Sequence, residues 1–114
     1  MAVLLLALAG CGGADRPDPD ANLVVAHAAL CEAAAEPAQA RALFFDRAHD
    51  ALHDVARRLD DVDRAQAAQL LEAKQVVESE LTATRQARPE DLRRLAEVYR
   101  TSLGRLAITV APCD

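Results

Sequence analysis

Two histidines in the middle of the chain have the spacing of neighbours on one helical face. His49 and His53 are four positions apart, and Asp46 and Asp50 each lie three positions before one of them. Residues four apart lie one turn apart on the same side of an α-helix. Two imidazoles with one or two carboxylates form a ligand set that Zn²⁺ and Cu²⁺ accept. The pattern therefore indicates a candidate metal site made of His49, His53, Asp46 and Asp50.

A solvated polar face without any ligand fits the same pattern, and we favour it. At roughly 100° per residue, the two histidines lie about 100–140° from the centre of the apolar face that includes Phe44. Buried metal sites in helical bundles use inward-facing Glu-x-x-His motifs from opposing helices, and the sequence contains none. We expect His49 and His53 to face the flank and the solvent, so that any metal there would be held weakly.

Three polar residues fall on the apolar stripes of expected helices. His27 lies one turn before Cys31, whereas Lys74 lies at the centre of its stripe with Glu78 one turn later, where the two can pair. A buried charge is costly unless it is paired or its head reaches water. We interpret His27, Lys74 and Glu78 as structural. The alternative for His27 is a role as a metal ligand, which needs a free Cys31 thiol. The alternatives for Lys74 are a cation in a partner-binding groove and a member of an interior network that includes His27.

Signatures of catalysis are absent from the sequence. The serines, Ser79 and Ser102, lie outside the Gly-x-Ser-x-Gly pattern of hydrolase nucleophiles. The sequence has neither a glycine-rich phosphate loop nor a Cys-x-x-Cys pair. The acidic residues are scattered over expected polar faces, where solvation explains them. We therefore expect a protein that is not an enzyme.

The first eleven residues, MAVLLLALAGC, combine an apolar stretch with two small residues before a cysteine. Leu8-Ala9-Gly10-Cys11 resembles the lipobox of bacterial lipoproteins. The resemblance implies that residues 1–10 are a signal peptide, that the Cys11 thiol receives a diacylglyceryl group, and that cleavage makes Cys11 the first residue. Signal peptides normally begin with positive charge, whereas the first basic residue here is Arg16. The alternative is an N-terminal core helix that ends in Gly-Cys.

Residues 11–20, CGGADRPDPD, are rich in glycine, proline and aspartate. Such a segment buries too little apolar surface to fold and predicts an extended tether. A lipid on Cys11 would then hold residues 21–114 at a bacterial membrane, on its periplasmic or cell-surface side. The resemblance thus implies an extracytoplasmic, lipid-anchored domain of the cell envelope.

With Cys11 acylated, Cys31 and Cys113 remain. An even pair of cysteines in an oxidising compartment is typical of a disulfide. This bridge would span 82 positions, for which the chain-entropy model gives about 4–5 kcal/mol of stabilisation. The alternative is two unpaired structural thiols.

Helical spacing of apolar residues recurs from Asp20 onward, and no segment has a convincing strand pattern. The expected helices cover 21–36, 38–59, 64–87 and a segment that begins at Pro89. Asp20 should cap the first helix and Asp60–Asp63 should form a capped turn before the third. We expect the apolar stripes of the second and third helices to extend to Val62 and Thr84, and Gly104 to weaken the last turn of the fourth.

Short connections between these helices predict an all-α fold, a small antiparallel up-down bundle of four helices. A three-helix bundle with a disulfide-pinned N-terminal helix is the alternative. Residues 108–114 should form an extended tail that carries Cys113 back to the first helix. The length of 114 residues fits one domain, residues 21–114, after the signal peptide and tether.

Charge and hydropathy exclude two classes of partner contact. Thirteen basic and eighteen acidic side chains give a net charge of −5, which argues against nucleic-acid binding because the phosphate backbone requires a basic surface. No stretch reaches the 18 or so consecutive apolar residues of a membrane-spanning helix. We expect a non-catalytic interaction or scaffold module that docks an envelope partner through a helix face. The alternative is a lipoprotein that binds Cu or Zn through His49 and His53; otherwise we expect no cofactor.

Overall fold

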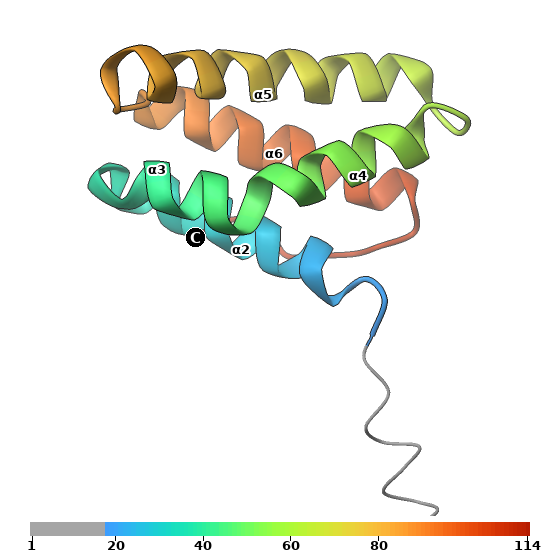
Figure 1. The fold of residues 1–114 in the computed structure, drawn as a ribbon. Coiled ribbons are helices and arrows are strands. Elements are labelled where there is room, and N and C mark those ends of the chain that lie inside the picture. Colours follow the sequence, from blue (N-terminus) through green and yellow to red (C-terminus); the bar gives the residue numbers. More distant parts are fainter. Residues whose placement is uncertain (1–17) are drawn as a thin grey trace, which may run out of the picture.

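The computed structural model describes residues 18–114, which form an antiparallel bundle of helices without a strand in that range (Figure 1). The expected all-α bundle is confirmed. Its helical segments are α2 (Ala21–Ala35), a composite run over 37–59, α5 (Arg64–Thr84) and α6 (Pro89–Arg105). The expectations for the signal peptide, for Cys11 and for the tether up to residue 17 lie outside the described residues. Within 18–114, no helix combines the length and the apolar character that a membrane span requires.

One α-helix was expected over 38–59, and the structure differs in the first half of this run. The run contains η1 (Pro37–Gln39), α3 (Ala40–Leu43), the π-helical turn η2 (Phe44–Ala48) and α4 (His49–Leu59). The wider π turn uses i→i+5 hydrogen bonds and so accommodates one extra residue. The apolar residues Phe44, Ala48, Leu52 and Val55, in and after this turn, are buried as expected.

The core lies between the helices and is filled mainly by leucine and alanine. α2 packs against α4 and α6, and α5 packs against the same two helices from the other side. The largest fully buried side chains are Tyr99, Phe44, Leu23, Leu30, Leu52, Leu59, Leu70, Leu81, Leu92, Leu95, Leu103 and Val55. The core is therefore filled mainly by small and branched aliphatic side chains, as the composition predicts.

The expected last residues of two apolar stripes, Val62 in the second helix and Thr84 in the third, are not buried. Val62 is 62% exposed because α4 stops at Leu59 and Val62 lies in the turn that follows. Thr84 is exposed because α5 ends there, where Arg85 takes a left-handed conformation with φ 65°. The Thr84 hydroxyl instead donates a hydrogen bond of 2.9 Å to the carbonyl of Glu80.

The expected helix caps have different outcomes. Asp63 caps α5, because its carboxylate accepts a hydrogen bond of 3.0 Å from the backbone N–H of Gln66. Asp20 does not cap α2 with its side chain. Its carboxylate accepts a hydrogen bond of 3.1 Å from Arg58 instead, so Asp20 ties the start of α2 to the end of α4.

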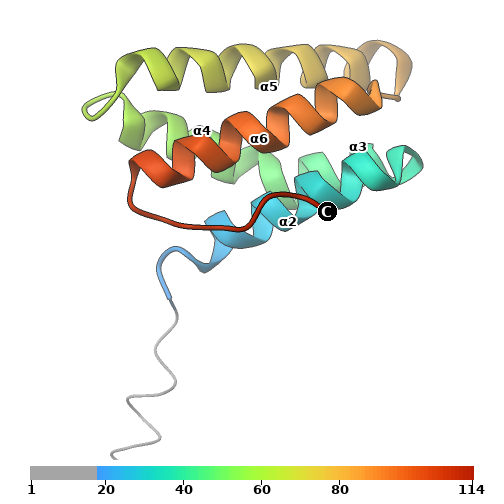
Figure 2. The same ribbon diagram turned by 180° about the vertical axis from the view of Figure 1, so that it is seen from behind.

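The C-terminal tail reverses direction at the end of α6. Gly104 does not end the helix, which continues to Arg105. Ala107 has a φ of 62°, and its N–H and that of Ile108 donate to the carbonyls of Gly104 and Leu103, the two bonds of a Schellman motif. The tail then runs back along the bundle to α2 (Figure 2).

The tail ends at the expected disulfide between Cys31 and Cys113, which is confirmed. Ile108, Val110 and Cys113 are partly buried and pack against the core on the way. The bridge therefore closes an extended tail onto α2.

Candidate functional site

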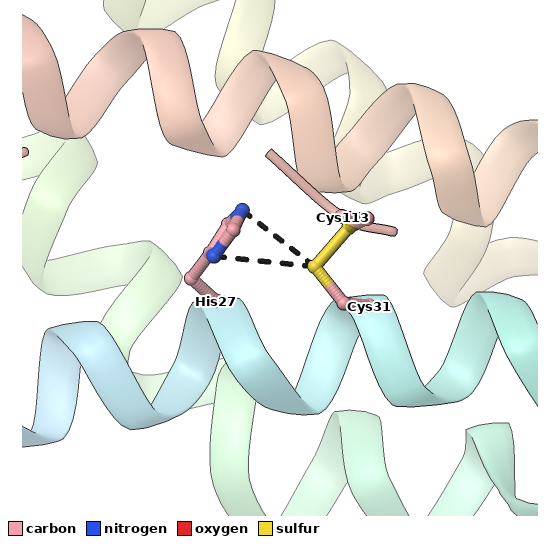
Figure 3. Close-up of side chains that lie close together, drawn as sticks. All are labelled: His27, Cys31 and Cys113. Atoms are coloured by element: carbon pink, nitrogen blue, oxygen red, sulfur yellow. Dashed lines mark hydrogen bonds between the residues drawn. A yellow bond between two sulfur atoms is a disulfide. The ribbon is translucent and has the colours of Figure 1, made fainter. Parts of the chain in front are cut away.

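The disulfide and His27 form one cluster between α2 and the tail, which we call the sulfur–imidazole cluster (Figure 3). His27 and Cys31 lie one turn apart on α2, and the Cys31 Sγ is 3.7 Å from Nε2 and 3.9 Å from Nδ1 of His27. One ligating atom from each of His27, Cys31 and Cys113 lies within 4.8 Å of the others. Among residues 18–114, no other group of three or more such side chains converges in this way.

His27 is the buried member of this cluster. It is 6% exposed, and its ring stacks on that of Tyr99 with 6.4 Å between the centroids and 18° between the planes. Burial lowers the pKa of His27, the positive charge of Arg100 lowers it further, and Glu97 opposes the shift. The imidazole is therefore held in its neutral form at pH 7, the form that ligates metals.

Arg100 attaches the tail next to this cluster. Its Nε donates a hydrogen bond of 3.1 Å to the carbonyl of Val110, and its guanidinium also donates to Glu97 at 3.0 Å. The tail is thus held by Arg100 three residues before Cys113, in addition to the disulfide.

A second group of polar side chains lies between α4 and α5, which we call the α4/α5 polar cluster: His49, His53, Lys74 and Glu78. Lys74 donates a hydrogen bond to one carboxylate oxygen of Glu78, and Nε2 of His49 lies 3.5 Å from the other. The rings of His49 and His53 contact edge to face, with 4.8 Å between centroids. The Lys74 hydrogen bond, opposed by partial burial, lowers the pKa of Glu78, and His49 adds to the effect.

His49 lies at the flank of the bundle, as expected, but it is turned towards α5 rather than fully towards the solvent. Its side chain is 28% exposed and contacts Glu78 and the ring of Phe44, whose centroid is 5.9 Å away. The Glu78 carboxylate on α5 and the ring of Phe44 cover the side of His49 that is turned towards α5. His53 is exposed, as expected.

The four residues of the candidate metal site are only partly brought together. Asp50 Oδ1 lies 3.4 Å from Nδ1 of His49, whereas Asp46 lines a separate surface depression with Glu32 and Glu36. Metal binding there stays a prediction. The carboxylate that does approach His49 from another helix is Glu78, which the sequence associated only with Lys74.

The two polar clusters are separate places in the fold. His27 contacts Cys31 and Tyr99, while Lys74 pairs with Glu78 on its own helix. These contacts do not join His27 to Lys74, so the alternative of an interior network between the two residues has no support in them.

A third feature is the outward face of α2, which we call the α2 apolar face: Ala21, Val24, Val25 and Ala28. All four are exposed, Val24 by 41% and Val25 by 52%. A helix that is apolar on every side is normally buried on every side. The sequence of α2 carries this signal, since its only polar residues besides Cys31 are Asn22, His27 and Glu32. The face was nevertheless missed, because apolar stripes alone do not separate a covered side from an open one.

The chain matches no protein-family model, no curated protein and no solved structure. Its function is therefore inferred from the chemistry of the two clusters and the α2 apolar face.

Proposed function

We propose that this protein is an exported bacterial lipoprotein, anchored through Cys11, whose helical domain is a non-catalytic interaction module of the cell envelope. The resemblance of Leu8-Ala9-Gly10-Cys11 to a lipobox supports the anchor. The α2 apolar face carries the proposal of a docking role, because it is exposed apolar surface at the end of the domain nearest the anchor.

The disulfide supports an extracytoplasmic location. Disulfides persist in oxidising compartments and are rare in the cytosol, where thiols are kept reduced. The Cys31–Cys113 bridge joins the tail to α2 and is part of the folded domain. A structural bridge of this kind fits a domain that folds after export.

The tether limits where a partner is found. Nine residues, 12–20, separate Cys11 from the first residue of α2, so that Cys11 and Ala21 lie at most about 36 Å apart when the segment is fully extended. The α2 apolar face therefore stays close to the membrane surface. The occupant we propose is a helix of an envelope protein, because alanine and valine let a second backbone approach closely.

A photo-crosslinking amino acid at position 25 tests this docking role in native membranes. We expect Val25 to give a specific crosslinked partner and the same probe at the exposed loop residue Val62 to give none. The paired change Val24→Asp and Val25→Asp should abolish binding of the partner and leave the melting temperature unchanged. The control Val62→Asp should change neither the binding nor the melting temperature. An anchored protein that yields no partner from position 25 contradicts the proposal.

A surface metal site is a second candidate, favoured by the close approach of the rings of His49 and His53 to each other and by their neighbours Glu78 and Asp50. Titration with Cu²⁺ and Zn²⁺ tests it against the double variant His49→Ala with His53→Ala. Binding weaker than about 10 μM, or binding that survives in the double variant, removes this candidate.

A further inference from the structure

We propose that reduction of the Cys31–Cys113 disulfide converts the sulfur–imidazole cluster into a binding site for a thiophilic cation, Cu⁺. The ligands are the thiolates of Cys31 and Cys113 and one ring nitrogen of His27. The inference is independent of the docking role and of the surface histidines.

One sulfur–nitrogen pair of the cluster already has nearly the separation that a bound metal requires, and the third ligand atom lies within 4.8 Å of both. Metal–sulfur and metal–nitrogen bonds of about 2.3 and 2.0 Å place sulfur and nitrogen ligands of one ion roughly 3.6–3.8 Å apart. Cys31 Sγ and His27 Nε2 are 3.7 Å apart. Binding then requires two local movements: the sulfurs separate once their bond is broken, and the imidazole turns about Cβ–Cγ to direct a lone pair at the ion.

The surroundings hold these ligands in place when the S–S bond is absent. His27 is backed by Tyr99, and the tail stays attached through the hydrogen bond from Arg100 to Val110 and the packing of Ile108. Cys113 follows three residues after this attachment. The Cys113 thiol therefore remains near α2. This is required for a site that takes ligands from both α2 and the tail.

Charge also favours the bound state. Two thiolates and one Cu⁺ carry a net charge of −1, and the Arg100 guanidinium binds the tail at Val110, three residues before Cys113. Opposite charge nearby stabilises thiolates over thiols.

Reduction must come first, and it has a defined reaction. Both cysteines are only partly buried, so a dithiol reductant can reach them. The dithiol is oxidised to its own disulfide as two electrons and two protons pass to Cys31 and Cys113. Cu⁺ then replaces the two thiol protons, which leave to solvent. The disulfide-bonded form offers no thiolate and does not bind.

The donor set distinguishes Cu⁺ from Zn²⁺. Soft thiolate ligands suit both ions, but Zn²⁺ with three protein ligands needs a fourth, normally water. Three-coordinate Cu⁺ needs no such fourth ligand. Three-coordinate Cu⁺ therefore fits this cluster best, and Zn²⁺ serves as the comparison.

Competition titration of the full chain with a chromophoric Cu⁺ chelator, without oxygen, measures the binding. We expect one equivalent of Cu⁺ to bind the reduced protein, none to bind the oxidised protein, and Zn²⁺ to bind more weakly. X-ray absorption of the complex should show two sulfur ligands and one nitrogen. His27→Gln should weaken Cu⁺ binding at least tenfold, and the control His53→Ala should leave it unchanged.

Several results overturn the proposal. Equal affinity of His27→Gln and the unmodified protein shows that the dithiol binds without the histidine. Weakening by His53→Ala moves the site to the surface histidines. Circular dichroism provides the check on folding: a reduced chain that loses its helices and does not regain them with Cu⁺ contradicts a preformed site. Absence of binding to the reduced, folded chain does so as well.

Discussion

The hydroxyl of Tyr99 donates a hydrogen bond of 2.8 Å to the backbone carbonyl of Leu23, and so joins α6 to α2 across 76 positions of sequence. Both residues are fully buried. Cys31 is held by Cys113 two turns further along α2. α2 is therefore attached at two points, by a hydrogen bond near its start and by a covalent bond near its end.

Tyr99→Phe removes the first attachment without changing the shape of the core. We expect the free energy of unfolding to fall by about 0.5–1.5 kcal/mol, since only the hydroxyl is lost. Urea unfolding followed by circular dichroism measures the change. An unchanged midpoint would show that the hydrogen bond contributes nothing to stability.

Removal of the disulfide should have the larger effect. The double variant Cys31→Ser with Cys113→Ser loses up to about 4–5 kcal/mol in the chain-entropy model, because the bridge closes a long loop. Urea unfolding of the variant and of the reduced natural chain should give similar midpoints, both far below that of the oxidised chain. Equal midpoints for the oxidised chain and the variant contradict a structural role for the bridge.

Two substitutions at the end of α6 should stabilise the protein. A Cβ added at Gly104 meets no atom within 4 Å, so Gly104→Ala gains about 0.5–1 kcal/mol of helix propensity. Ala107 is left-handed with a φ of 62°, so Ala107→Gly relieves strain of about the same size. Ala107→Val is the matched opposite change and should destabilise; a gain in stability there would refute this interpretation of the tail turn.

The Lys74–Glu78 pair predicts an asymmetry between its two partners. Glu78→Ala leaves a buried ammonium group unpaired and should cost about 1–3 kcal/mol. Lys74→Met fills a similar volume without a charge and should be neutral or stabilising, because pairing offsets the cost of burial only in part. Chemical denaturation of both variants tests this. A larger loss in Lys74→Met than in Glu78→Ala would reverse the conclusion.

Stability should decrease as the pH falls below 7. Burial lowers the pKa of His27, so the unfolded chain takes up a proton first as the pH falls through the ordinary value of 6.5. The stability present above that value is then lost progressively down to the folded pKa. Denaturation at pH 7.5 and pH 5.5 measures the difference, which should be smaller in His27→Gln. An equal difference in both proteins would assign the effect to other groups.

Helix positions and the disulfide could be predicted from the sequence because both depend on local spacing and on the number of cysteines. The π turn over 44–48 could not, because Phe44, Ala48 and Leu52 also fit a regular α-helix and the extra residue is accommodated only through packing against other helices. The contact between His49 and Glu78 joins α4 to α5. It depends on how two helices pack, so the spacing of residues along one helix could not predict it.

The position of His27 shows the same division. Its burial next to Cys31 follows from one helical turn of sequence. Its approach to Cys113 and Tyr99 depends on the path of the tail and on the packing of α6. Helical spacing predicted that His27 lies beside Cys31, and the number of cysteines predicted the bond from Cys31 to Cys113. The contact between His27 and Tyr99 was found only in the tertiary structure.

The intact mass of the protein purified from its native membrane tests the central proposal most directly. We predict a chain that begins at Cys11, carries the added mass of a diacylglyceryl group, and lacks the two hydrogens lost in forming the Cys31–Cys113 bond. A polypeptide that retains residues 1–10 and carries no lipid, recovered from the cytosol, would contradict both the anchor and the envelope location.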